Sequence, residues 1–204
     1  MSLFAFGMAA AVLALTPGPG MAYVVARTVA GGRKEGLASC LGTGIGGMLH
    51  VLAAALGLSA LLAQSALAFS LLKYVGAAYL VYWGVRLLMQ KTPEGDSTPV
   101  SPQGARRAFA EGILVEALNV KTALFFLAFL PQFTTPAEPL LLQLVLLGSI
   151  CVALNTLVDV MAVLGAQRLL KSGLGRSARA RLMTRTSGVT MVGLGVWLAL
   201  TKRG

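Results

Sequence analysis

The chain has 204 residues, of which 56% are hydrophobic and 12% are charged, and its mean hydropathy is +0.79. Soluble domains carry about 25% charged residues, so this composition excludes a soluble globular protein and predicts an all-α integral membrane fold. The net charge of +10 would suggest nucleic acid only in a soluble protein. Here the basic residues lie in short loops between apolar segments, so we expect a lipid bilayer as partner and no nucleic acid.

Six apolar segments predict six transmembrane helices. We place these spans 1 to 6 at residues 3–25, 36–62, 69–89, 112–133, 140–164 and 186–200. Basic loops are expected at residues 27–35 and 168–185, and residues 91–107 are rich in proline and glycine, which predicts an exposed linker. We therefore expect one transmembrane domain, residues 1–204, whose halves cover residues 1–90 and 108–204.

Span 1 is interrupted by the sequence Thr16-Pro17-Gly18-Pro19-Gly20. Each proline removes a backbone donor and disfavours the helical conformation of the residue before it, so we expect helix 1 to break at Pro17–Gly20. Irregular backbone occurs in a membrane only where protein buries it or where it lines a cavity. Thr16, Pro17, Gly18 and Pro19 are therefore candidate binding residues, and a purely structural kink is the alternative.

Spans 4 and 5 carry polar residues at membrane depth, where ionisable groups are costly and usually mark a pathway. Span 4 contains Glu116, Asn119 and Lys121, and span 5 contains Asp159 four residues after Asn155. We take Asn119, Lys121 and Asp159 as candidate binding residues. The alternative is a structural salt bridge that joins Lys121 to Glu116 or, more favourably, to Asp159.

Three residues are candidates for proton coupling: Asp159, Glu116 and His50. His50 is the only histidine of the chain and lies in the middle of span 2. A histidine at this depth can relay protons, although a hydrogen bond to a neighbouring helix would also explain it.

The distribution of basic residues predicts the orientation in the membrane. Most of the 17 Lys and Arg residues lie in the loops that follow spans 1, 3 and 5. Because such loops stay in the cytoplasm, both termini are expected in the periplasm. Three spans in each half then give two inverted three-helix repeats, with the interrupted spans 1 and 4 at corresponding positions. This arrangement is typical of transporters that bind their substrate near the middle of the membrane.

Several segments together resemble the LysE/RhtB-type amino-acid exporters of bacterial inner membranes (lysine and homoserine–threonine efflux), over nearly the whole chain. These segments are Thr16-Pro17-Gly18-Pro19, residues 31–36 with their basic pair, residues 71–80, residues 118–133 and Asp159. The resemblance implies a multi-pass secondary transporter that exports amino acids or related small metabolites by proton antiport.

This chain departs from the family's pattern at three positions. The family usually has Asn-Pro-Lys where this chain has Asn119-Val120-Lys121, and it often has Asn at the positions of Glu116 and Gly20. Without the proline, span 4 is expected to be less kinked. The additional carboxylate is expected to change the charge preference or the proton coupling.

An amino acid is a zwitterion, so its site needs a group for each charge. We expect Lys121 and the free N–H groups at the break in span 1 to bind the carboxylate. Asp159 or Glu116 would bind the ammonium group, and one of these acids would carry the exchanged proton.

Two other functions remain open at this stage. Cys40 and Cys151 lie in the corresponding spans 2 and 5, so a membrane thiol-disulfide electron carrier is one alternative, and a non-transporting scaffold is another. The sequence shows no nucleophile–base arrangement, phosphate loop or metal-ligand cluster, so we expect neither an enzyme nor a cofactor nor a metal. The glycine-rich faces of spans 2 and 6 can pack within a monomer or in a homo-oligomer.

Overall fold

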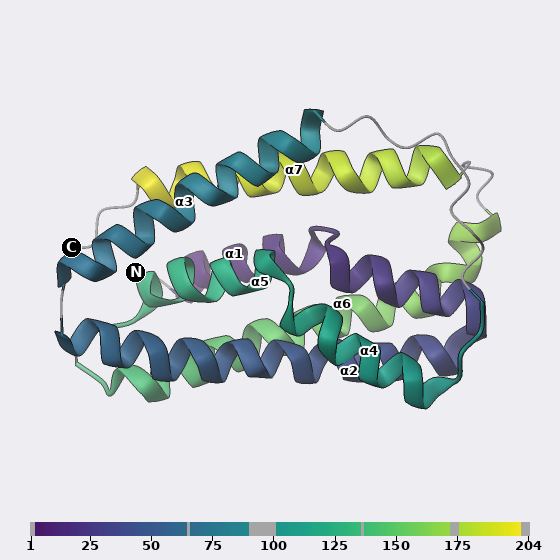
Figure 1. The fold of residues 1–204 in the computed structure, drawn as a ribbon, viewed down its shortest axis with the longest axis horizontal. Coiled ribbons are helices and arrows are strands. Elements are labelled where there is room, and N and C mark those ends of the chain that lie inside the picture. Colours follow the sequence, from purple (N-terminus) through teal and green to yellow (C-terminus); the bar gives the residue numbers. More distant parts are fainter. Residues whose placement is uncertain (1–2, 65, 90–100, 136, 172–175, 201–204) are drawn as a thin grey trace.

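The computed structural model describes residues 3–64, 66–89, 101–135, 137–171 and 176–200. These residues form helices and no strand, which confirms the all-α fold for the described part of the chain (Figure 1). The elements are α1 (Leu3–Leu15), α2 (Pro19–Gln64), α3 (Ala66–Met89), α4 (Ala105–Ala117), α5 (Val120–Leu124), the π-helix η1 (Phe125–Phe129), the 3-10 helix η2 (Leu130–Phe133), α6 (Leu140–Lys171) and α7 (Arg176–Leu200).

Two described segments, Pro19–Gly57 and Leu140–Gly165, are long and apolar enough to cross a membrane. The pair formed by Ala105–Ala117 and Val120–Phe133 would be a third span if its two bent parts act as one, and Phe4–Leu15 is a shorter apolar helix. The part of the chain that the structure describes therefore supports a membrane protein with two or three such spans, and six remains a prediction.

The first helix breaks as its prolines predict, although slightly earlier. Helix α1 ends at Leu15, residues 16–18 are not helical, and α2 begins at Pro19. A proline at the start of a helix is favoured because the first N–H groups have no helical partner in any case. Pro19 therefore begins the next helix, and the break covers residues 16–18 instead of Pro17–Gly20.

Helix α2 reverses direction at Gly32, which has a φ of 75° and a ψ of −171°. Glycine adopts such a positive φ without steric cost. Figure 1 shows the first part of α2 running to one end of the molecule and the remainder returning beside it. The basic loop expected at residues 27–35 is therefore reduced to a turn at one residue, with helix on both sides.

The fourth span also differs from its expected limits. It begins at Ala105, breaks after Ala117 and resumes at Val120, and its two parts are bent by 45°. This break forms without a proline at position 120, because the side chain of Asn119 accepts a hydrogen bond from the N–H of Lys121 at 3.1 Å and caps α5.

Two further predictions concern connecting segments. In the linker expected at residues 91–107, residues 91–100 lie outside the described residues, and residues 101–104 are not helical. The basic loop expected at residues 168–185 is largely helical, since α6 extends to Lys171 and α7 begins at Arg176. Arginine and lysine are good helix formers, so a basic stretch next to an apolar span can continue its helix.

Glycines allow the helices to pack closely. A Cβ atom built at Gly42 of α2 would lie 2.2 Å from the carbonyl oxygen of Phe109 in α4, and one at Gly195 of α7 would lie 2.8 Å from that of Ala77 in α3. In Figure 1, α3 and α7 run alongside each other as a pair, and α2 runs beside α4. The glycine-rich faces of spans 2 and 6 thus pack within the monomer.

Aromatic stacking joins the α3–α7 pair to the fourth span. The rings of Phe125 and Phe129 stack at 5.2 Å, and the ring of Phe129 stacks on Trp197 of α7 at 4.9 Å. Both phenylalanines are fully buried. This contact holds the segment that follows the α4–α5 break against α7.

Candidate functional site

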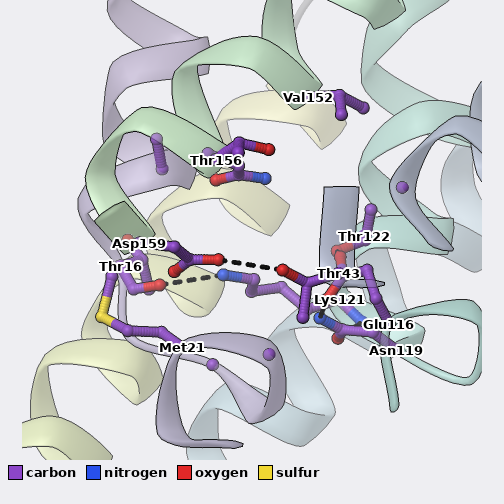
Figure 2. Close-up of a pocket in the computed structure, with 15 residues that line it drawn as sticks. Thr16, Met21, Thr43, Glu116, Asn119, Lys121, Thr122, Val152, Thr156 and Asp159 are labelled. Atoms are coloured by element: carbon purple, nitrogen blue, oxygen red, sulfur yellow. Dashed lines mark hydrogen bonds between the residues drawn. The ribbon is translucent and has the colours of Figure 1, made fainter. Parts of the chain in front are cut away.

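The two helix breaks meet around a polar cavity in the interior of the bundle (Figure 2). Its walls come from the α1–α2 break, the second part of α2, the α4–α5 break and α6. The lining residues are Ala14, Thr16, Gly18, Gly20, Met21, Thr43, Gly47, Glu116, Asn119, Lys121, Thr122, Val152, Asn155, Thr156 and Asp159. We refer to this space as the polar cavity.

Most of the residues predicted from the sequence line the polar cavity. Thr16, Gly18, Asn119, Lys121 and Asp159 do so, together with the proton-coupling candidate Glu116 and with Asn155. Pro17, Pro19 and His50 are not among its lining residues. The structure therefore brings together residues of spans 1, 4 and 5, which are far apart in the sequence.

The polar cavity is small in this conformation. Its volume is about 30 Å³, and one water molecule needs roughly 10–15 Å³ on this measure, so the space holds about two waters. An amino acid does not fit unless the surrounding helices move apart. The structure therefore shows the site in a closed state.

Lys121 closes the break in the first span. Its Nζ donates hydrogen bonds to the carbonyl oxygens of Thr16 at 2.9 Å and Leu13 at 3.4 Å. The last carbonyls of a helix have no helical partner and carry partial negative charge, so the end of α1 attracts the ammonium group. Figure 2 shows the Lys121 side chain reaching across the cavity to Thr16.

The salt bridge considered for Lys121 is not present. The ion pairs among the described residues have Arg27 and Arg107 as their cations, and Lys121 forms none with Glu116 or Asp159. The carbonyls of Leu13 and Thr16 at the end of α1 take the place of the acids as its partners. The charges in the cavity are therefore not fixed to one another by direct contact.

Glu116 is held by its own helix break. Its Oε2 accepts a hydrogen bond from Asn119 Nδ2 at 3.0 Å, and its Oε1 accepts one from Thr122 Oγ1 at 2.6 Å. A Cβ atom at Gly20 would lie only 2.4 Å from Glu116 Oε2. Two departures from the family's pattern, Gly20 and Glu116, are therefore in contact, and the small residue leaves room for the larger one.

Asp159 has fewer partners than Glu116. It is 7% exposed, and its Oδ2 accepts a hydrogen bond from Thr43 Oγ1 at 3.3 Å. Figure 2 shows its carboxylate facing the Lys121 side chain across the cavity. Since a carboxylate can accept about four hydrogen bonds, Asp159 retains acceptor capacity for a bound cation.

His50 contacts the backbone at the α4–α5 break and not the Glu116 carboxylate. Its Nε2 lies 2.7 Å from the carbonyl oxygen of Glu116, and because a carbonyl only accepts, this nitrogen must donate. The contact matches the simpler interpretation, a hydrogen bond to a neighbouring helix. Its role in proton coupling stays a prediction.

Sequence reasoning missed Thr43, Thr122 and Gly20 as residues of the site. Thr43 lies between Gly42 and Gly44 in span 2. A polar residue among glycines in an apolar span was the available signal, because glycines allow a second helix to approach that face closely. Gly20 stood out in the sequence as the end of the break and as a departure from the family's pattern, but its contact with Glu116 depends on the tertiary structure.

The two cysteines lie apart in the described structure. Cys40 and Cys151 are both buried and belong to two separate apolar clusters, so they are not placed as a pair. No group of three or more His, Cys, Asp or Glu side chains that could hold a metal ion occurs in the described ranges.

Known proteins resemble this chain over most of its length. The profile of the family described as LysE type translocator matches residues 11–202. An uncharacterized membrane protein of Vibrio cholerae is 31% identical over 202 residues, covering 97% of this chain and 96% of the relative. A homoserine/homoserine lactone efflux protein of Salmonella typhimurium is 31% identical over 166 residues, 81% of each chain. A leucine efflux protein of Salmonella choleraesuis is 28% identical over 142 residues, covering 68% of this chain and 66% of the relative. No solved structure matches the chain significantly.

These findings confirm the resemblance seen in the sequence. The matched residues include both helix breaks and Asp159, so they cover the whole polar cavity. Translocators move a substrate across a membrane and are not enzymes, and two relatives are named as efflux proteins for homoserine/homoserine lactone and for leucine. The chain therefore belongs to the LysE type translocator family.

Proposed function

We propose that this protein is a secondary transporter that exports amino acids or related small metabolites across a bacterial inner membrane. One observation carries the proposal: Lys121 and Asp159 line the same cavity between two broken helices. The Asp159 carboxylate accepts a hydrogen bond from one side chain, Thr43. A zwitterionic amino acid needs this pair of charges. The names of the efflux relatives support the same substrate class.

In the proposed binding mode, the carboxylate of the substrate replaces the carbonyls of α1 as the partner of Lys121. The N-terminal end of α2, where Gly18 and Gly20 line the cavity, adds backbone N–H groups and the positive end of the helix dipole. The ammonium group of the substrate binds Asp159. Pro17 and Pro19 contribute by holding the backbone of the break open.

We further propose proton antiport through Asp159. Asp159 is buried and makes no direct ion pair with Lys121, which binds the carbonyls of α1 instead. Because a buried charge without a directly paired ion is costly, the empty site would hold a proton on this carboxylate and release it when an ammonium group arrives. Glu116 is less suited, because two side-chain donors, Asn119 and Thr122, already bind its carboxylate. His50 would serve only as a support of the break.

The six-span topology with two inverted repeats is part of the proposal. It is supported by the presence of one broken helix in each half, at residues 16–18 and 118–119. Figure 1 shows the turn within α2 and the start of α4 at one end of the molecule and the start of α1 at the other. The basic residues at the first end favour a cytoplasmic location, which would put both termini in the periplasm.

The test is transport of labelled amino acids in proteoliposomes with an imposed pH gradient. We expect saturable, gradient-dependent movement, and a loss of at least about tenfold in rate for Lys121→Met and Asp159→Asn, since each removes a charged partner of the substrate. Matched controls are Lys34→Met and Glu138→Gln, because both side chains are exposed and outside the polar cavity. Normal transport by folded Lys121→Met and Asp159→Asn proteins would refute the assignment.

A further inference from the structure

A second, larger cavity lies on the other side of the two helix breaks. Its volume is about 360 Å³, and it separates the breaks from the α3–α7 pair. The lining residues are Pro17, Gly18, Pro19, Ala22, Trp83, Leu87, Leu118, Asn119, Val120, Lys121, Thr184 and Met191. We call this space the apolar cavity. Its size is within the range of small-molecule sites, about 300–1,000 Å³.

The two cavities are neighbours. Gly18, Asn119 and Lys121 line both of them. A Cβ atom at Gly18 would lie 3.0 Å from Lys121 Nζ and 3.1 Å from its Cε, so the lysine side chain passes directly over this glycine. The Lys121 side chain therefore forms part of the wall between the two cavities, and it is flexible enough to turn away. It can lie in this position because Gly18 has no side chain.

The chemistry of the two cavities is complementary. The polar cavity holds both carboxylates, Glu116 and Asp159, whereas no acidic residue is among the described residues that line the apolar cavity. Of these described residues Lys121 is the charged one, and most of the others, such as Trp83 and Met191, are apolar. A cationic side chain would meet a positive charge there and no counter-charge.

From this arrangement we infer that the apolar cavity receives the side chain of a neutral, apolar amino acid, while the polar cavity holds its ammonium and carboxylate groups. This inference rests on the proposed export function and specifies its substrate class. When the surrounding helices move apart and Lys121 turns from Thr16 to the substrate carboxylate, the space above Gly18 opens and the cavities join. Selectivity then follows from the cost of placing a polar or charged side chain in an apolar space.

The first experiment compares leucine, alanine, homoserine and lysine as substrates of the full chain in proteoliposomes. We expect a kcat/KM for leucine at least about tenfold above that for lysine. Filling the cavity with Met191→Trp should raise the KM for leucine at least about tenfold, and that for alanine less than about twofold, because the alanine methyl group occupies little of the apolar cavity. Leu157→Trp is the matched control, since Leu157 of α6 is exposed and lines neither cavity.

A second variant, expected to gain lysine transport, tests the inference even if the tryptophan variant does not fold. Thr184 lines the apolar cavity on α7, so Thr184→Glu places a carboxylate there and should increase lysine transport while it decreases leucine transport. If leucine and lysine are transported equally, or if Met191→Trp slows leucine and alanine alike, the cavity is a gap filled by lipid and the inference fails, although the export function stands. Silence for every amino acid would overturn both.

Discussion

The contact between Gly20 and Glu116 gives a sharp test of the site's geometry. Replacing Gly20 by Asn, the residue that often stands there in the family's pattern, adds a Cβ atom 2.4 Å from Glu116 Oε2 and 3.5 Å from its Cδ. Atoms cannot remain that close, so the carboxylate must move. It then gives up the hydrogen bond from Asn119 Nδ2, which is 3.0 Å long.

The size of the effect follows from what is lost. A hydrogen bond to a charged group contributes about 1.5–3 kcal/mol, and the displaced atom is the end of a flexible side chain, so overpacking adds little. We therefore expect Gly20→Asn to lower the free energy of unfolding by roughly 1.5–3 kcal/mol, which corresponds to about 3–12 °C in melting temperature for a chain of this length. Glu116→Asn shortens the facing side chain, so the double variant should recover at least about 1 kcal/mol of that loss.

The assay is thermal unfolding of the purified protein in detergent, followed by the fluorescence of its two tryptophans. The wild type, both single variants and the double variant form a double-mutant cycle. Gly57→Asn is the matched control, since a Cβ atom at Gly57 would meet nothing within 4 Å. Additive effects of the two substitutions, or an unchanged melting temperature for Gly20→Asn, would show that the two residues are not in contact.

Two further predictions concern the helix break and the helix packing. Val120→Pro should keep transport and raise the free energy of unfolding by about 0.4–1 kcal/mol. Val120 is the first residue of α5, and Asn119 already has the extended conformation (φ −76°, ψ 100°) that proline requires in the residue before it. Loss of folding or transport would contradict this geometry. Gly42→Ala should destabilise the protein by about 1–3 kcal/mol, because the added Cβ would lie 2.2 Å from the backbone oxygen of Phe109. The control Gly57→Ala should not destabilise it, since a Cβ there meets nothing within 4 Å. Equal melting temperatures for the two alanine variants would refute the packing of α2 on α4.

The local chemistry of particular residues was sufficient to predict part of the site. Pro17 and Pro19 exclude a continuous first helix in any fold, so the break was predictable to within two residues. Asn119, Lys121 and Asp159 were identified because polar groups are costly at membrane depth. Their common cavity followed from the expectation that such groups gather in the protein interior.

The connecting segments were less predictable, because a basic stretch next to an apolar span can form either a loop or a continuation of the helix. The turn at Gly32 needs only one residue with a positive φ, so a basic stretch that favoured a loop became helix on both sides. The basic residues that follow span 5 also continue the helix to Lys171. Charge excludes these residues from the membrane, but it does not exclude them from a helix.

Composition and local motifs are enough to identify a helical membrane protein, the place where its first helix breaks and the polar residues that are unusual at membrane depth. The partners of those residues depend on how the helices pack. This packing places Lys121 on the carbonyls of α1 and not on Asp159, sets Glu116 against Gly20, and gives the polar cavity an apolar neighbour. The physical reason is that composition and proline act within a few residues along the chain, whereas the partner of a buried charge is selected by distances between helices that are far apart in sequence.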